Sequence, residues 1–238
     1  DGKLALWQVI ARAHSQGSRL SAVRLAKTTA AADVIGFERG FCEDNLYDNL
    51  TWLCENQEAI EKRLFAFRRG QGSPQFFLYD VTSSYLEGDH NALADWGYNR
   101  DKKRGKKQIV IGLLCDEEGE PLSVEVFAGN TADPRTFGAQ VKKVAERFGC
   151  RRITFVGDRG MIKSAQIEDL ESIDFHYITA ITKAQIRSLI KKGVFQLELF
   201  DQHLCEIQDD GVRYVLRRNP LRAKEMAASR TSKLAALQ

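Results

Sequence analysis

The hydrophobic period of this chain changes at the segment GQGSP, residues 70–74. Before it, apolar residues recur in steps of three and four from Leu46 to Phe67, which predicts one continuous helix packed on a core. Shorter helical patterns over residues 4–12 and 20–26 precede this helix. After the segment, the apolar runs are short and strand-like. We therefore expect a helical N-terminal region followed by a sheet-containing domain.

The elements after residue 74 are predicted in a definite order. Strands are expected over residues 76–83, 108–116 and 121–128, a helix over 133–148, a strand over 152–157, a helix over 164–171 and a strand over 175–181. Asp133 is the predicted N-cap of the first of these helices, with Pro134 at its first turn. A hairpin meander followed by helical crossovers predicts an α/β fold, a mixed five-stranded sheet covered by helices.

Composition limits the classes of function. The 35 Lys and Arg residues exceed the 32 Asp and Glu residues by only three, so any attraction to nucleic acid must come from local clusters. The five cysteines form no CxxC pair and the four histidines no HxxxH pair, which argues against a zinc site or a disulfide framework and favours a cytoplasmic setting. The sequence has no apolar run of about 18 residues, so no membrane anchor is predicted.

Two aspartates are placed where they can carry chemistry. Asp80 lies in the middle of the strand-like run FFLYDVTSSY, and Asp158 follows the predicted fourth strand. Right-handed crossovers place that strand beside the first, so the two carboxylates are expected to meet at one end of the sheet. Either the hydroxyls after Asp80 hold it and Asp158 merely opens a turn before Gly160, or a divalent cation relieves the repulsion of the pair.

The metal-binding alternative corresponds to a known type of phosphodiester chemistry. Two Mg²⁺ ions roughly 3.5 to 4 Å apart activate an oxygen nucleophile, stabilise the leaving oxygen and relieve charge at phosphorus. Asp80 would bridge both ions and Asp158 would hold one of them. Asp133 is better explained as a helix cap than as a third member of this site.

A basic segment adds a second signal for nucleic acid. The run YNRDKKRGKK lies between the first two predicted strands, and such clusters attract phosphates and make binding salt-dependent. Its basic residues are Arg100, Lys102, Lys103, Arg104, Lys106 and Lys107. A solvated loop would explain them equally. Trp96 and Tyr98 precede the cluster and could either stack on bases or anchor the loop in the core.

Four segments in this order, DVTSSYLEG, GYNRDKKRGKKQIVIGLL, EVFAGNTAD and VGDRGM, resemble the DDE-type transposases of bacterial insertion sequences, in the broad insertion-sequence family four. The resemblance implies an RNase H-like core in which Asp80 and Asp158 are the first two catalytic acids and metal ligands. It also implies Mg²⁺, which Mn²⁺ can replace, and double-stranded DNA partners, namely terminal inverted repeats and target DNA. A homodimer on DNA is expected, and Arg159 joins the basic loop as a DNA-binding candidate.

The third acid of the family, a glutamate, has no clear counterpart. The segment from Phe175 to Leu197 contains no Asp or Glu, and the spacing in which this branch carries its glutamate on a later helix does not occur. Glu225 is a weak candidate, and we expect the third acid beyond Gln238.

The expected organisation is a helical region over residues 1–72, an RNase H-like core over 73–192, a β-rich insertion over 193–218 and the start of a helix over 219–238. The predicted function is DNA transposition, by strand cleavage and transfer at the ends of an insertion sequence. The alternatives are an inactive or repurposed transposase that only binds DNA, and an RNase H-like nuclease.

Overall fold

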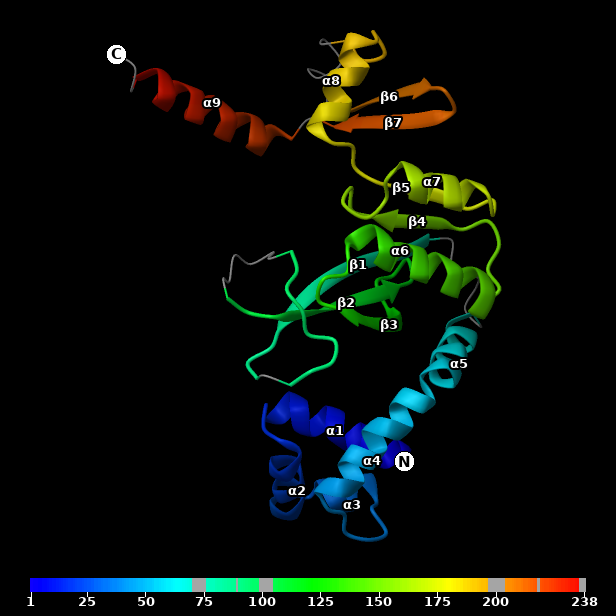
Figure 1. Cartoon of the computed structure of the whole chain (residues 1–238), viewed down its shortest axis with the longest axis vertical. Coiled ribbons are helices and arrows are strands. Elements are labelled where there is room, and N and C mark those ends of the chain that lie inside the picture. Colours follow the sequence, from blue (N-terminus) through cyan, green and yellow to red (C-terminus); the bar gives the residue numbers. More distant parts are fainter. Residues whose placement is uncertain (70–75, 89, 99–104, 197–203, 218, 236–238) are drawn as a thin grey trace. The chain divides into compact units, whose positions relative to one another are not determined.

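The computed structural model describes residues 1–69, 76–88, 90–98, 105–196, 204–217 and 219–235 (Figure 1). Contacts divide the chain into two compact units, Asp1–Ile178 and Thr179–Gln238. The first unit contains N-terminal helices and a five-stranded sheet, and the second contains helices and a hairpin. The finer domain boundaries drawn from the sequence stay a prediction.

The first unit begins with helices that surround a small core of their own. They are α1 (Gly2–His14), α2 (Arg19–Thr28), α3 (Ala31–Ile35) and α4 (Glu43–Glu55), whereas the next helix, α5 (Gln57–Arg69), contributes Phe65 to the core of the sheet. Trp7 of α1 and Leu46 of α4 are fully buried in this cluster, together with small residues of α2. The buried side-chain amide of Gln8 donates to Oδ1 of Asn49 at 3.0 Å and to the carbonyl of Leu46 at 3.2 Å, which ties α1 to α4, while its Oε1 has no hydrogen-bond partner among the described residues.

The single helix predicted from Leu46 to Phe67 is wrong, because the chain breaks between α4 and α5 at Asn56. Asn56 adopts φ −100° and ψ 5°, outside the helical range. Its side-chain amide donates to the carbonyl of Trp52 at 2.8 Å, and its own backbone N–H donates to the same carbonyl at 3.0 Å. The asparagine side chain thus gives the carbonyl of Trp52 a second donor and caps the end of α4, which hydrophobic spacing alone does not reveal.

The sheet has the order β3-β2-β1-β4-β5. Its strands are β1 (Phe76–Tyr85), β2 (Gln108–Cys115), β3 (Pro121–Ala128), β4 (Thr154–Gly157) and β5 (His176–Ile178). The first three pair antiparallel, whereas β4 runs parallel to β1 and β5 parallel to β4. The predicted fold class, a mixed five-stranded α/β sheet with flanking helices, is confirmed. The longest strand, β1, lies at the centre.

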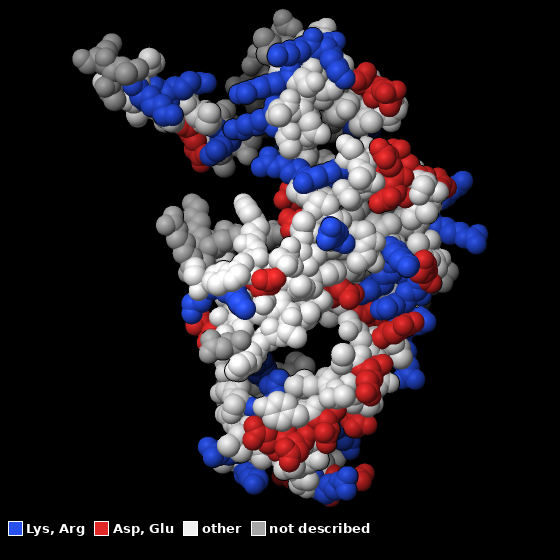
Figure 2. Space-filling view, viewed as in Figure 1, with Lys and Arg blue, Asp and Glu red and all other residues white. Residues whose placement is uncertain are grey.

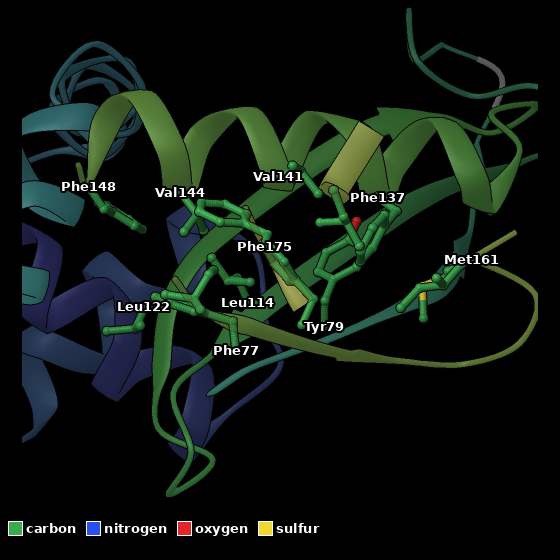
Figure 3. Packing of buried hydrophobic residues seen from close by; sticks show 14 of the residues in the cluster. Phe77, Tyr79, Leu114, Leu122, Phe137, Val141, Val144, Phe148, Met161 and Phe175 are labelled. Carbon is green, nitrogen blue, oxygen red and sulfur yellow. The ribbon is translucent and has the colours of Figure 1, made fainter. Parts of the chain in front are cut away.

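One face of the sheet is covered by α6 (Asp133–Lys142), the π-helical turn η1 (Lys143–Arg147) and α7 (Ser164–Glu171). Figure 3 shows Phe137, Val141 and Val144 pointing from this helix onto Phe77 and Tyr79 of β1. Side chains alternate across a strand, so Asp80 stands on the opposite face. There its partner across the ladder, Leu113, is 43% exposed.

The start of α6 corrects one prediction. Ala132 is its N-cap and Asp133 is already its first helical residue, without a side-chain cap hydrogen bond. The apolar stripe of the helix, from Phe137 to Phe148, is buried as expected, and Gly149 ends it at a φ of +63°. The widened turn at η1 was not foreseen. Turns of this type often accompany functional or strained sites, and this one presents Lys143 and Arg147 to a buried carboxylate.

A buried ion-pair network joins α5 to the sheet through Glu61. Its carboxylate accepts hydrogen bonds from the hydroxyl of Ser123 at 2.7 Å and from Arg147 at 2.7 Å, and it lies 3.7 Å from the ammonium of Lys143. The ammonium also contacts Glu125 at 2.6 Å. Burial alone would raise the pKa of Glu61, but a hydrogen bond from the side-chain amide of Gln57 at 3.0 Å, those from Ser123 and Arg147, and the charge of Lys143 outweigh it and lower that pKa below 4.5. The ionised carboxylate therefore stabilises the join between helices and sheet.

The second unit contains α8 (Lys183–Lys191), a hairpin of β6 (Leu204–Asp209) and β7 (Val212–Arg217), and α9 (Pro220–Ala235). The predicted strand over 195–200 lies largely outside the described residues. Helices α8 and α9 together carry seven lysines and arginines against one glutamate. Figure 2 shows these basic side chains gathered over the second unit, whereas acidic ones gather over the N-terminal helices. Helix α4 alone carries four acids and no lysine or arginine.

Glu61→Gln is expected to lower the free energy of unfolding near pH 7 by about 1–3 kcal/mol, since a buried charged hydrogen-bond network loses its anion. Because the folded-state pKa of Glu61 is depressed, its stabilisation is fully present above pH 4.5 and lost as the pH falls through the folded value. The gap between wild type and variant should thus shrink below pH 4.5 in urea titrations. Glu168→Gln, at an exposed carboxylate of α7, is the control, and an equal effect there would contradict the assignment.

Candidate active site

The register of β1 and β4 places Asp80 and Asp158 at neighbouring positions. Tyr79 pairs with Gly157 across this parallel ladder, and each aspartate is the next residue along its strand. Parallel neighbours lie about 4.8 Å apart, so the two side chains start from adjacent backbone positions at the carboxyl end of β4. The expected neighbouring backbone positions are thus observed, whereas the meeting of the two carboxylates at one end of the sheet stays a prediction. Their role as metal ligands stays a prediction.

The carboxylate of Asp80 is exposed rather than buried. Its hydrogen-bond donor in the described residues is the backbone N–H of Val81, at 2.8 Å from Oδ1. The hydroxyl of Ser83, one of the proposed alternatives, is buried and makes no hydrogen bond. The charge in the middle of β1 is therefore tolerated because it faces solvent, and its second oxygen is available to a ligand.

Asp158 does open a turn, as the alternative interpretation expected. Its backbone carbonyl accepts from the N–H groups of Met161 at 3.0 Å and Ile162 at 3.3 Å. The turn uses the backbone, however, and within the described ranges the carboxylate Oδ1 of Asp158 accepts a hydrogen bond from the adjacent N–H of Arg159, at 2.6 Å. The turn and a ligand-binding role are thus compatible.

A third carboxylate comes close to this turn. A Cβ atom built on Gly160 would lie 3.6 Å from Oδ2 of Asp133 and 3.8 Å from Oδ2 of Asp158. The two oxygens therefore flank one small volume above a residue without a side chain. The sequence predicted that Asp133 is a helix cap. Its position near Asp158 could have been inferred from Gly160, the glycine directly after the segment GDR.

The pKa of the Tyr79 hydroxyl, on the core face of β1, is affected by the charges around the site. Burial raises the pKa of its hydroxyl to about 12, Thr136 lowers it slightly, and the carboxylates of Glu125, Asp133 and Asp80 raise it further. No hydrogen bond of good geometry reaches this hydroxyl. Acids from β1, β3 and α6 thus make a negative environment around the centre of the sheet, which suits a cation.

The predicted DNA-binding residues are only partly described. Arg100, Lys102, Lys103 and Arg104 lie outside the described residues. Lys106 contacts Glu87 at 2.6 Å, while Lys107 and Arg159 are exposed. The basic residues of α8 and α9 were not predicted, because they are spaced along two helices and do not form one dense run in the sequence.

The third acid is not located in the described part of the chain. No group of three or more His, Cys, Asp or Glu residues there could hold a metal ion together. Glu225 belongs to α9 in the second unit, where it forms an ion pair with Arg222 at 2.8 Å. Within the described ranges, no helix is both long and apolar enough to cross a membrane.

The chain matches the family described as Transposase DDE domain over residues 71–230. It therefore belongs to this family, and its sheet is RNase H-like. Membership in insertion-sequence family four stays a prediction. No curated protein matches the sequence.

Solved structures of transposase complexes are similar at low identity. A piggyBac transposase synaptic complex with hairpin DNA is 12% identical over 61% of this chain and 31% of that one, with a TM-score of 0.40. A Mos1 transposase paired-end complex with left transposon end is 8% identical over 80% and 70%, with a TM-score of 0.31. The chain thus spans about a third of the length of the piggyBac protein.

Gly112→Ala is expected to cost about 1–3 kcal/mol of stability, because its Cβ would overlap the Tyr79 hydroxyl and lie 2.9 Å from the ring Cζ. Tyr79→Phe alone should be nearly neutral, since it removes a buried hydroxyl without a partner. The double variant should recover part of the loss, which denaturant titrations measure as a coupling energy. Gly138→Ala is the control, because nothing lies within 4 Å of its Cβ position; simple additivity would refute the contact.

Proposed function

We propose that this chain carries out metal-dependent cleavage and transfer of DNA strands at the ends of an insertion sequence, with Asp80 and Asp158 as catalytic metal ligands. The observation that carries this proposal is the parallel pairing of Tyr79 with Gly157, which sets the two aspartates side by side. Family membership supports the reaction class.

The donor set fits a divalent cation such as Mg²⁺ or Mn²⁺. Asp80 and Asp158 offer hard oxygen ligands from separate strands, and a neighbouring backbone N–H orients one oxygen of each carboxylate. Asp133 adds negative charge beside Asp158. When bound, such ions supply an activated oxygen nucleophile and relieve charge at phosphorus.

The protein's own cations would hold the DNA. Arg159 follows Asp158 directly and can contact a phosphate next to the scissile one, while Lys107 lies at the start of β2. The basic faces of α8 and α9 offer further phosphate contacts, which would give salt-dependent, sequence-independent affinity. The acidic helix α4 would repel the duplex, so DNA is expected to avoid that surface.

Asp80→Ala and Asp158→Ala should each lower the rate of strand cleavage by more than about a hundredfold, because even residues that only support metal ligands contribute 10–100-fold. The assay uses DNA carrying the element's two ends, with Mg²⁺ or Mn²⁺, and scores both cut and joined products. Asp169→Asn, at an exposed acid of α7, is the control. Unchanged cleavage in both alanine variants would reject the site, and cutting without joining would favour a nuclease.

Metal binding can be tested without turnover. Mg²⁺ in hundredfold excess over its dissociation constant should stabilise the wild-type chain by up to about 3 kcal/mol. Asp80→Asn and Asp158→Asn should abolish most of this shift in thermal unfolding, whereas Asp169→Asn should retain it. Equal shifts in all four proteins would mean that the cation binds elsewhere.

A second candidate function is DNA binding without catalysis. It is favoured by the finding that the described residues bring no three metal-binding side chains together. Binding of element ends by a chain that neither cuts them nor responds to Mg²⁺ or Mn²⁺ would select it.

A further inference from the structure

Two large aromatic side chains stand in solvent on the connection between β1 and β2. Trp96 is 58% exposed and Tyr98 is 80% exposed. Exposing one such ring forgoes the burial of 150–250 Å² of surface, and here two lie within three residues. The structure therefore excludes the expectation that they anchor the loop in the core. Figure 1 shows this connection extending away from the sheet.

The backbone beneath these rings is held firmly. Asp95 and Gln108 exchange two backbone hydrogen bonds, of 3.1 and 3.0 Å, and Gly129 donates to the carbonyl of Leu93 at 2.9 Å. The amide of Gln108, which is 2% exposed, donates to the carbonyls of Gly129 at 3.0 Å and Tyr98 at 3.3 Å. The segment before and after Trp96 is thus fastened to the start of β2.

Side chains and close packing complete this platform. The carboxylate of Asp95 accepts from the backbone N–H of Trp96 and from the amide of Asn130, each at 2.7 Å. A Cβ atom on Gly97 would overlap the carbonyl oxygen of Gly129, so the two backbones touch between the aromatic residues. Rigid elements display binding groups at a low entropic cost, and this one displays two aromatic rings.

The charge nearby indicates the kind of ligand. Lys106 and Lys107 follow within the same connection, which the sequence fills with six basic residues between Arg100 and Lys107. Aromatic rings beside cations suit nucleic acid, since bases stack on the rings while phosphates meet the charges. Paired bases already stack on each other inside a duplex, so free rings select bases that are unpaired or displaced.

The β1–β2 ladder gives the distance, measured along the strand, between Asp80 and the position to which this platform is fastened. Gln108 pairs with Tyr85, five residues along β1 from Asp80. Five residues of strand span about 17 Å, so the ladder position to which the platform is fastened lies about 17 Å along β1 from Asp80.

We propose that Trp96 and Tyr98 form a stacking site for unpaired DNA bases, fastened to the ladder about 17 Å along β1 from Asp80. The inference rests on the proposed function as a DNA-processing enzyme. It adds recognition of single-stranded or frayed DNA to the phosphate binding considered above, and it assigns a use to a segment whose exposure otherwise costs solubility.

The test compares binding of two labelled DNAs, a fully paired duplex and the same duplex with an unpaired thymine tail, by fluorescence anisotropy. Trp96→Ala and Tyr98→Ala should each raise the dissociation constant for the tailed DNA by about 5- to 100-fold, from the loss of one stacked base, and leave that for the duplex nearly unchanged. Trp96→Phe should restore most of the affinity because it restores a ring. Leu93→Ala, an exposed apolar residue of the same segment, is the control.

The possible outcomes separate the two proposals. Equal weakening on both DNAs, or an equal loss in Leu93→Ala, would overturn the stacking site and indicate a general role of the loop or a protein-binding patch. An unchanged tailed complex in both alanine variants would overturn it as well. Failure of the wild-type chain to bind either DNA would overturn DNA processing itself, and the stacking site with it. Unaltered melting of Trp96→Ala would show that folding is not the cause.

Discussion

The parallel pairing of β1 with β4 is the interaction on which the candidate site depends. It joins residues 78 positions apart in the sequence, and its register alone decides whether Asp80 and Asp158 are neighbours. A slip of one residue would move one of them to the opposite face. The pairing is secured from below, where Phe77 and Phe155 pack with Phe137 in the core. Core packing and site geometry are thus set by the same residues.

Much of this architecture could be predicted from the sequence. Strand order followed from the change in period and from the right-handed crossover rule, which needs no side-chain detail. The break at Asn56, the π-helical turn and the Glu61 network could not be predicted, because each depends on contacts between residues far apart in the chain or on a local side-chain hydrogen bond to one carbonyl. Asp133 was misplaced by one residue, a shift within the usual uncertainty of helix ends.

The exposure of side chains was the least predictable property. Asp80 attracted attention as a charge apparently buried in a strand, yet it lies on a solvent-facing side of β1. Trp96 and Tyr98 could have been core residues by composition alone, and only their exposed fractions of 58% and 80% in the structure show that they are not. The pattern of residue types indicates the helical or strand period. Whether a given face is buried or exposed depends on which other elements pack against it.

Gly112 limits which substitutions this chain can accept during evolution. Because Gly112 has no side chain, the tip of the Tyr79 ring occupies the space where a Cβ atom would lie. Tyr79 directly precedes Asp80 in the sequence. Any heavier residue there would push that ring and, through one peptide unit, disturb the carboxylate beside it. A substitution at this buried glycine would therefore disturb the proposed site, and a compensating change at Tyr79 would restore it.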